Sequence, residues 1–282
     1  MSRFTSFACA DWSGAKGSRH PGIELAVCKL GDAAPVLIAP PGKNWSRRAI
    51  AEWVLEQGDD LLIGFDFSFA PPLIERGSYL PGEYLPSTAK QFWAYVDAVC
   101  DDDDLGAASF LEHRHRSHFY FGAADGVKAS FLHWRQCEIL NKISTGKTST
   151  VFDAIGASQV AKASFAGMRL LNLLAPHVAI WPFDNDGGKG PVVVEIYTTI
   201  AARAAGVAKG RSKIRDAASL DIALAVLGSK QHDALARYTD HATDAILTAA
   251  WLRQVAADQA YWTPAALNSE IAQTEGWTFG VI

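Results

Sequence analysis

The sequence of 282 residues contains few cysteines and no excess of positive charge. Its four cysteines are far apart and form no C-x-x-C pair, so we expect reduced thiols and a cytoplasmic protein. The formal net charge of −4 predicts no general attraction to nucleic acid or to an anionic membrane. Contact with nucleic acid would therefore require a local basic patch.

Long apolar runs are also missing. No stretch reaches the roughly 18 to 20 apolar residues of a membrane span, and the first residues lack the basic and apolar regions of a secretory signal. We therefore expect no membrane partner. The chain is 49% hydrophobic and has nine Trp and fourteen Phe, which favours a folded core over disorder. We expect residues 1–282 to form one domain.

Three apolar runs that we expect to be strands each carry an acid at or near the carboxyl end. They place Asp11 after residues 4–10, Asp66 within residues 61–69 and Glu195 after residues 192–194. An ionised carboxylate is costly to bury unless it is paired or bound to a metal. One such acid is usually a turn or cap residue, but the recurrence favours a shared carboxylate site.

The order of the elements predicts how two of these acids meet. We expect strands near 4–11, 24–30 and 35–39, then a helix that Asn44 or Ser46 caps and that extends to about Gln57, and the strand at 61–69. If the first three strands form a meander, the helix crosses over and brings the fourth strand parallel to the first. Adjacent strands are about 4.8 Å apart, so Asp11 and Asp66 can share a divalent ion. We predict an α/β fold with a mixed five-stranded sheet of order 3-2-1-4-5 between helices.

Residues 71–150 interrupt this alternation, and we interpret them as a largely helical insertion or cap over the active end of the sheet. Within them, Arg114 and Arg116 alternate with histidines just before the aromatic residues 119–121. Basic residues beside aromatics suit phosphate contact and base stacking, so both arginines are substrate-binding candidates. An exposed basic face of a strand is the equal alternative.

Two other stretches invite a phosphate-binding interpretation. Residues 12–17 form a Gly-containing turn next to Asp11, which suits a metal-bound phosphate and makes Ser13 and Lys16 candidates; a tight hairpin connection would look similar. Residues 144–148 resemble part of a P-loop, but Asn141 stands where the first Gly belongs. Lys147 is kept only as a candidate phosphate contact. The stretch 184–188 resembles a hairpin turn.

A final helix is expected from Asp240, with His241 and Asp244 on neighbouring parts of its first turns. Acids also favour helix N-termini, so capping is the alternative for Asp240. The Ala-rich residues that follow allow close packing on the sheet, which would bring Asp244 toward Asp11. His241 is a candidate ligand, proton carrier or hydrogen-bonding residue.

Four short motifs carry a resemblance to a known superfamily. They are Ala10-Asp11-Trp12-Ser13-Gly14, Phe65-Asp66-Phe67-Ser68-Phe69, Glu195-Ile196-Tyr197 and His241-Ala242-Thr243-Asp244-Ala245. Their order resembles the ribonuclease H-like superfamily, and in particular its "predicted RNase H-like nuclease" proteins; the last motif is also similar to one in junction resolvases. The resemblance implies that fold and implies Asp11, Asp66 and Asp244 as metal ligands.

These observations lead to a functional hypothesis, a nuclease that uses Mg²⁺ or Mn²⁺ to hydrolyse DNA or RNA. Two ions about 3.5–4 Å apart would activate water and stabilise the leaving oxygen. Oxygen ligands suit such hard cations. The catalytic candidates are Asp11, Asp66, Glu195, His241 and Asp244, and the four acids are the candidate metal ligands. The alternatives are a non-catalytic scaffold of this fold and an actin- or sugar-kinase-like phosphotransferase that uses ATP.

Overall fold

The computed structural model describes residues 3–145, 148–155, 160–185, 188–208 and 213–282. Its centre is a six-stranded sheet of order β3-β2-β1-β4-β6-β5. The strands are β1 (Ser6–Asp11), β2 (Glu24–Lys29), β3 (Val36–Leu37), β4 (Leu61–Phe65), β5 (Ala179–Trp181) and β6 (Val192–Glu195). The first three form an antiparallel meander, whereas β1, β4, β6 and β5 pair in parallel. The expected α/β class is confirmed.

The predicted strand order 3-2-1-4-5 is wrong beyond β4. The strand next to β4 is β6, and the shorter β5 forms the edge. Every residue of β6 is buried, as expected of an interior strand with covered faces. Because β5 and β6 are parallel, the connection that includes residues 184–188 is not the predicted hairpin. Residues 186 and 187 lie outside the described part of the chain.

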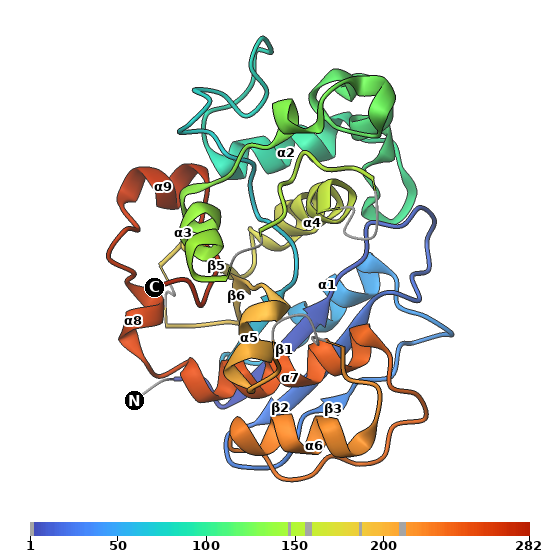
Figure 1. Cartoon of the computed structure of the whole chain (residues 1–282), viewed down its shortest axis with the longest axis vertical. Helices are drawn as coiled ribbons and strands as arrows, with labels where there is room; N and C mark the ends of the chain where they lie inside the picture. The colour runs from blue at the N-terminus through green and yellow to red at the C-terminus, as the bar shows by residue number, and fades with distance from the viewer. Residues whose placement is uncertain (1–2, 146–147, 156–159, 186–187, 209–212) are drawn as a thin grey trace.

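The two faces of the sheet support separate apolar clusters, and helices cover both (Figure 1). Along β1, Phe7 and Cys9 belong to one cluster and Ala8 and Ala10 to the other, as strand alternation requires. The first cluster includes α5 (Thr198–Ala204), α6 (Ala217–Val226) and α7 (Asp240–Val255). The second includes α1 (Arg47–Leu55), α2 (Ala89–Val99) and α4 (Val160–Leu174).

Small residues allow α7 to lie close to the sheet. Ala245 and Ala249 of the helix are fully buried, and the thiol of Cys28 on β2 lies 3.5 Å from the Ala249 carbonyl oxygen. On β4, a Cβ added at Gly64 would lie 3.1 Å from Leu252 Cδ1 and 2.7 Å from Ile196 Cγ2. The close packing fixes the first turns of α7 at the carboxyl ends of β1 and β4.

The expected helices have the following outcomes. The helix predicted at 46–57 is α1, and the Ser46 hydroxyl accepts a hydrogen bond from the Ala49 amide as its N-cap. After β6 the chain forms α5 and then α6. The other helices are α3 (Gln136–Thr145), α8 (Gln259–Trp262) and α9 (Ser269–Thr274). Across the described residues, no helix has the length and apolar character needed to cross a membrane.

Within residues 71–150, the described part, 71–145 and 148–150, contributes no strand to the sheet. They contain α2, α3 and five short helical turns at Asp103–Leu105, Phe110–Arg114, Arg116–His118, Ala123–Asp125 and Lys128–Phe131. The segment begins after β4, and its last helix, α3, supplies Glu138 and Asn141 to a cavity that also contains Asp66. One part of the segment therefore approaches the sheet end that carries the strand-end acids.

Candidate functional site

Asp11 is the last residue of β1 and Asp66 directly follows β4, and these two strands are parallel neighbours in the sheet. Ala10 of β1 pairs with Phe65 of β4, and the Asp66 amide donates to the Ala10 carbonyl at 3.3 Å. Asp11 shares a sheet face with Cys9, and Asp66 lies two residues beyond Gly64, which faces α7. Both acids are therefore at the same end and on the face covered by α7.

Helix α7 adds His241 and Asp244 to this end of the sheet. The imidazole Nδ1 of His241 lies 2.5 Å from Asp11 Oδ2. Gly22 makes room for the ring, because a Cβ there would lie 3.3 Å from His241 Nε2. Thr239 is the N-cap of the helix, and its hydroxyl accepts a hydrogen bond from the Ala242 amide, so the first turn has a fixed position.

Burial raises the pKa of each of the three aspartates. The pKa of Asp66 lies well above its ordinary value because of burial and the charges of Asp11 and Asp244. Burial and the charge of Asp11 raise the pKa of Asp244 to about 7. Burial also raises the pKa of Asp11, although the hydrogen bond with His241 opposes this shift. The three side chains thus form one electrostatically linked group, the aspartate group.

Basic side chains do not neutralise the inner part of this group. Asp66 Oδ2 accepts a hydrogen bond from the Thr198 hydroxyl at 3.2 Å. Neither Asp66 nor Asp244 forms an ion pair with a lysine or arginine in the described part of the chain. A buried carboxylate without a cationic partner is costly, and a bound cation would remove that cost. The donor set suits a hard divalent cation.

The carboxylate oxygens of the aspartate group are more widely spaced than the ligands around a single bound ion. Among the described residues, the ligand atoms that lie within 4.8 Å of one another in a group of three belong to Glu83, His115 and His118 instead. Mutual repulsion of the carboxylates and the hydrogen bond that His241 donates to Asp11 both favour this separation. The aspartates are at one sheet end, and their sharing of one ion stays a prediction.

Glu195 does not join the aspartate group. It pairs with Phe65, so strand alternation directs its side chain to the opposite face from Asp66. Its carboxylate accepts hydrogen bonds from Arg135 Nη1 at 2.7 Å, from the Phe69 amide at 2.7 Å and from the Thr278 hydroxyl at 2.5 Å. These donors already compensate its charge. Its predicted role as a ligand beside Asp66 is therefore corrected to that of an internal ion-pair partner.

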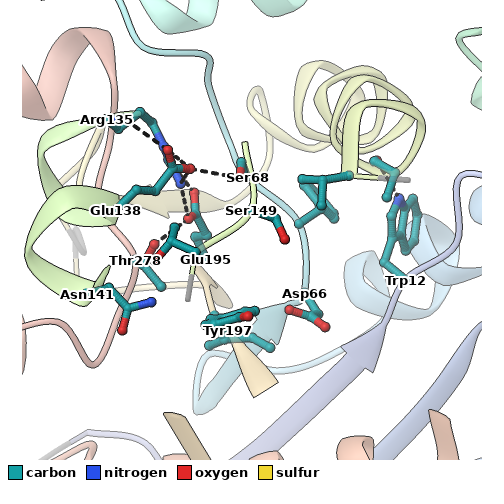
Figure 2. A pocket seen from close by; sticks show the side chains of 15 residues that line it. Trp12, Asp66, Ser68, Arg135, Glu138, Asn141, Ser149, Glu195, Tyr197 and Thr278 are labelled. Atoms are coloured by element: carbon teal, nitrogen blue, oxygen red, sulfur yellow. Dashed lines mark hydrogen bonds and ion pairs between the residues drawn. The ribbon is translucent and has the colours of Figure 1, made fainter. Parts of the chain in front are cut away.

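A cavity of about 260 Å³ lies between these two acids. Figure 2 shows Arg135, Glu138 and Glu195 gathered on one side of it, with Asp66 apart from them. The hydroxyls of Ser68, Ser149 and Tyr197 also line the cavity. It gives a small polar group access to Asp66.

The candidates in the first turn have different surroundings. The Ser13 hydroxyl is near His241, since both side chains approach the position that a Cβ on Gly22 would occupy, at 3.4 and 3.3 Å. The Ser13 carbonyl accepts a hydrogen bond from Arg47 Nη2 at 2.7 Å. The Lys16 ammonium instead pairs with Glu112 at 2.7 Å. Ser13 is thus beside the site, whereas Lys16 is occupied elsewhere.

The other basic candidates are not brought to the aspartate group. Arg114 Nε donates to the Tyr95 hydroxyl at 3.3 Å, and Arg116 Nη2 pairs with Asp125 at 2.7 Å. Neither arginine lines the cavity beside Asp66. Lys147 lies outside the described residues.

Two basic residues that the sequence argument missed lie near α7. Lys213 and Arg215 both pair with Asp240, the first residue of that helix, and Lys213 lines a cavity of about 100 Å³ together with Asp244. The sequence does contain an indication of a basic site here, because four of the seven residues ending at Arg215 are basic. The first four of these seven lie outside the described residues.

Glu24 is a further acid that the sequence argument missed. It is the cross-strand neighbour of Asp11, and burial and the Asp11 charge raise its pKa, while His241 lowers it. Together these residues concentrate carboxylate oxygens and one imidazole at a sheet end, with Lys213 near Asp244 and Arg215 beside Asp240. Comparisons with protein-family models, curated proteins and solved structures found no match.

Proposed function

We propose that this protein is a metal-dependent nuclease that hydrolyses phosphodiester bonds in nucleic acid. The observation that carries the proposal is the aspartate group, in which burial raises the pKa of three converging acids. Neither Asp66 nor Asp244 has a basic ion-pair partner among the described residues. The order of the sequence motifs, which resembles that of ribonuclease H-like proteins, supports the same chemistry.

Asp11, Asp66 and Asp244 would hold Mg²⁺ or Mn²⁺, which suit oxygen ligands. When bound, these ions supply an activated water and stabilise charge on the leaving oxygen. His241 is the best-placed proton carrier. Its hydrogen bond to Asp11 raises its pKa, and 46% of its side chain is exposed. With Nδ1 bonded to Asp11, a proton on Nε2 is available to the leaving oxygen.

The proposal is tested by cleavage of single-stranded, duplex and branched DNA and RNA by the wild-type protein. We expect cleavage with Mg²⁺ or Mn²⁺, its loss after chelation, and its recovery when the metal is restored. Release of phosphate from ATP is measured in the same samples. No cleavage of any substrate would contradict the nuclease proposal and favour the scaffold, and phosphate transfer from ATP alone would favour the kinase-like alternative.

Nucleic-acid binding should depend on Lys213 and Arg215. The two side chains share one carboxylate, Asp240, so one positive charge remains, and they are 66% and 53% exposed. We expect the double substitution Lys213→Gln/Arg215→Gln to weaken binding and to reduce the slope of log affinity against log salt by about one, in keeping with the one positive charge that Asp240 leaves uncompensated. Fluorescence anisotropy over about 50 to 200 mM salt, with chelator to prevent cleavage, measures both effects.

The matched control is Arg114→Gln/Arg116→Gln. It removes the same amount of charge from the patch predicted by sequence, where Tyr95 and Asp125 hold the guanidinium groups. We expect this variant to bind nearly as well as the wild type. The reverse outcome, a reduced slope only in the Arg114/Arg116 variant, would move the nucleic-acid contact to residues 71–150.

A further inference from the structure

A second group of potential ligands lies within residues 71–150. Glu83 belongs to the connection between β4 and α2, His115 directly precedes the turn at Arg116–His118, and His118 is the last residue of that turn. Glu83 Oε1 lies 3.6 Å from His115 Nδ1 and 3.6 Å from His118 Nε2. One ligand atom from each residue lies within 4.8 Å of the others.

His115 has a buried nitrogen that lacks a hydrogen-bond partner. Its side chain is 3% exposed and its ring lies 4.5 Å from that of Phe110, measured between centroids. Nε2 is 2.9 Å from the Tyr95 hydroxyl, but Nδ1 forms no hydrogen bond. The separation of 3.6 Å from Glu83 is too long for one. An unpartnered buried polar atom is unfavourable and calls for an explanation.

The tautomer compatible with a ligand has its proton on Nε2. In this form Nε2–H donates to the Tyr95 oxygen, and the lone pair of Nδ1 points toward the Glu83 carboxylate. Two electron-pair donors then face each other and need a cation between them.

The distances between Glu83 and the two histidines fit ligands around a metal ion better than direct hydrogen bonds. Ligands about 2.0–2.1 Å from a tetrahedral zinc ion lie about 3.3 Å apart. The two separations of 3.6 Å between Glu83 Oε1 and the histidine nitrogens are close to this distance between ligands. Two imidazoles with one carboxylate also form a softer donor set than the aspartate group, which favours a transition metal over Mg²⁺.

We propose that Glu83, His115 and His118 bind one zinc-type transition-metal ion. Three protein ligands leave a fourth position for water or a small anion. Tyr95 would orient the ring of His115 through Nε2, a contact of the kind that supports metal-bound imidazoles. The ion would fasten the connection before α2 to the turn at Arg116–His118. The site is independent of the proposed nuclease chemistry.

The test is a zinc titration of the full chain after removal of metal, followed by calorimetry. The Asp66→Asn variant serves as background, so that the aspartate group contributes less to binding. We expect one equivalent of Zn²⁺, a higher melting temperature with Zn²⁺, and the visible bands of tetrahedral Co²⁺ when cobalt replaces it. The absence of zinc binding in this background and in the wild type would overturn the proposal.

Substitutions separate the three ligands from general metal affinity. Glu83→Gln and His118→Ala should each weaken zinc binding by about 100-fold or more, and Tyr95→Phe by about 10- to 100-fold. The side chains of Glu83 and His118 are 41% and 14% exposed, so their removal disturbs the core less than removal of His115. His113→Ala, an exposed histidine of the same segment, is the control. Equal affinity in the Glu83, His118 and His113 variants would also overturn the proposal.

Discussion

Replacing Asp66 with Asn should reduce phosphodiester cleavage by about 1,000-fold or more. The substitution keeps the shape of the side chain and an oxygen for the Thr198 hydroxyl, but it removes one negative charge from the aspartate group. A loss of about 4 kcal/mol of transition-state stabilisation, a reasonable share of what bound ions provide, corresponds to this factor. Rates are measured at saturating Mg²⁺ and Mn²⁺ on the substrate that the wild type cleaves best.

At pH values above neutral, the same substitution should raise the melting temperature of the metal-free protein. The pKa of Asp66 is raised in the folded state, so the folded protein keeps this proton to higher pH than the unfolded chain does. Stability therefore falls as pH rises from the unfolded pKa, about 3.9, through the folded pKa. Asn removes this loss, and the gain over wild type should be small near pH 4 and grow as pH rises.

Asp60→Asn is the matched control, since Asp60 precedes the strand β4 that Asp66 follows. Asp60 accepts a hydrogen bond from the Thr5 hydroxyl, which lowers its pKa, so its replacement should slightly reduce stability and leave cleavage unchanged. Cleavage by Asp66→Asn at the wild-type rate would remove Asp66 from the catalytic site. A lower melting temperature at high pH would show that its charge is already compensated.

Replacing Arg135 with Met should destabilise the fold by about 3–5 kcal/mol. The guanidinium is 1% exposed; it donates to Glu138 Oε1 at 3.0 Å, to Glu195 Oε2 at 2.7 Å and to the Glu275 carbonyl at 3.0 Å. Its loss leaves two buried carboxylates without their cation. Urea or thermal unfolding at pH 7 measures the change, and the melting temperature should fall by about 10 °C.

Two further variants test the cause of this destabilisation. Arg135→Met/Glu195→Gln should regain part of the lost stability, because one uncompensated charge is removed with the cation. Arg116→Met breaks a pair with Asp125 in which the arginine is 38% exposed, and it should cost less than about 1 kcal/mol. If the double variant is less stable than Arg135→Met alone, packing rather than charge explains the effect.

Local patterns predicted the parts of the fold that local forces determine. The apolar runs located β1, β4 and β6, and Ser46 with the following apolar residues located α1. The helix crossover also predicted that β4 lies parallel to β1. The place of β6 could not be predicted in this way, because it depends on which of two late strands finds full burial beside β4.

The positions of candidate site residues could be predicted from the sequence where the residue's own strand or helix determines its position. Asp11, Asp66 and Asp244 follow from strand ends and from the Ala-rich helix α7. The orientation of Glu195 depends on its register with Phe65, which a single sequence does not encode locally. One partner of Arg135, Glu195, is likewise 60 residues away, and the residues next to Arg135 in the sequence do not predict that contact.

The Arg135 ion cluster also has a consequence for the order of events during synthesis. Its contacts join Arg135 to Glu195 across 60 positions and to Glu275 across 140. At about 5–20 residues per second, a ribosome needs about 7 to 28 s to advance from the first of these residues to the last. Throughout that interval the nascent chain holds a guanidinium whose burial site is incomplete. The region around Arg135 therefore reaches its native packing no earlier than the emergence of Glu275.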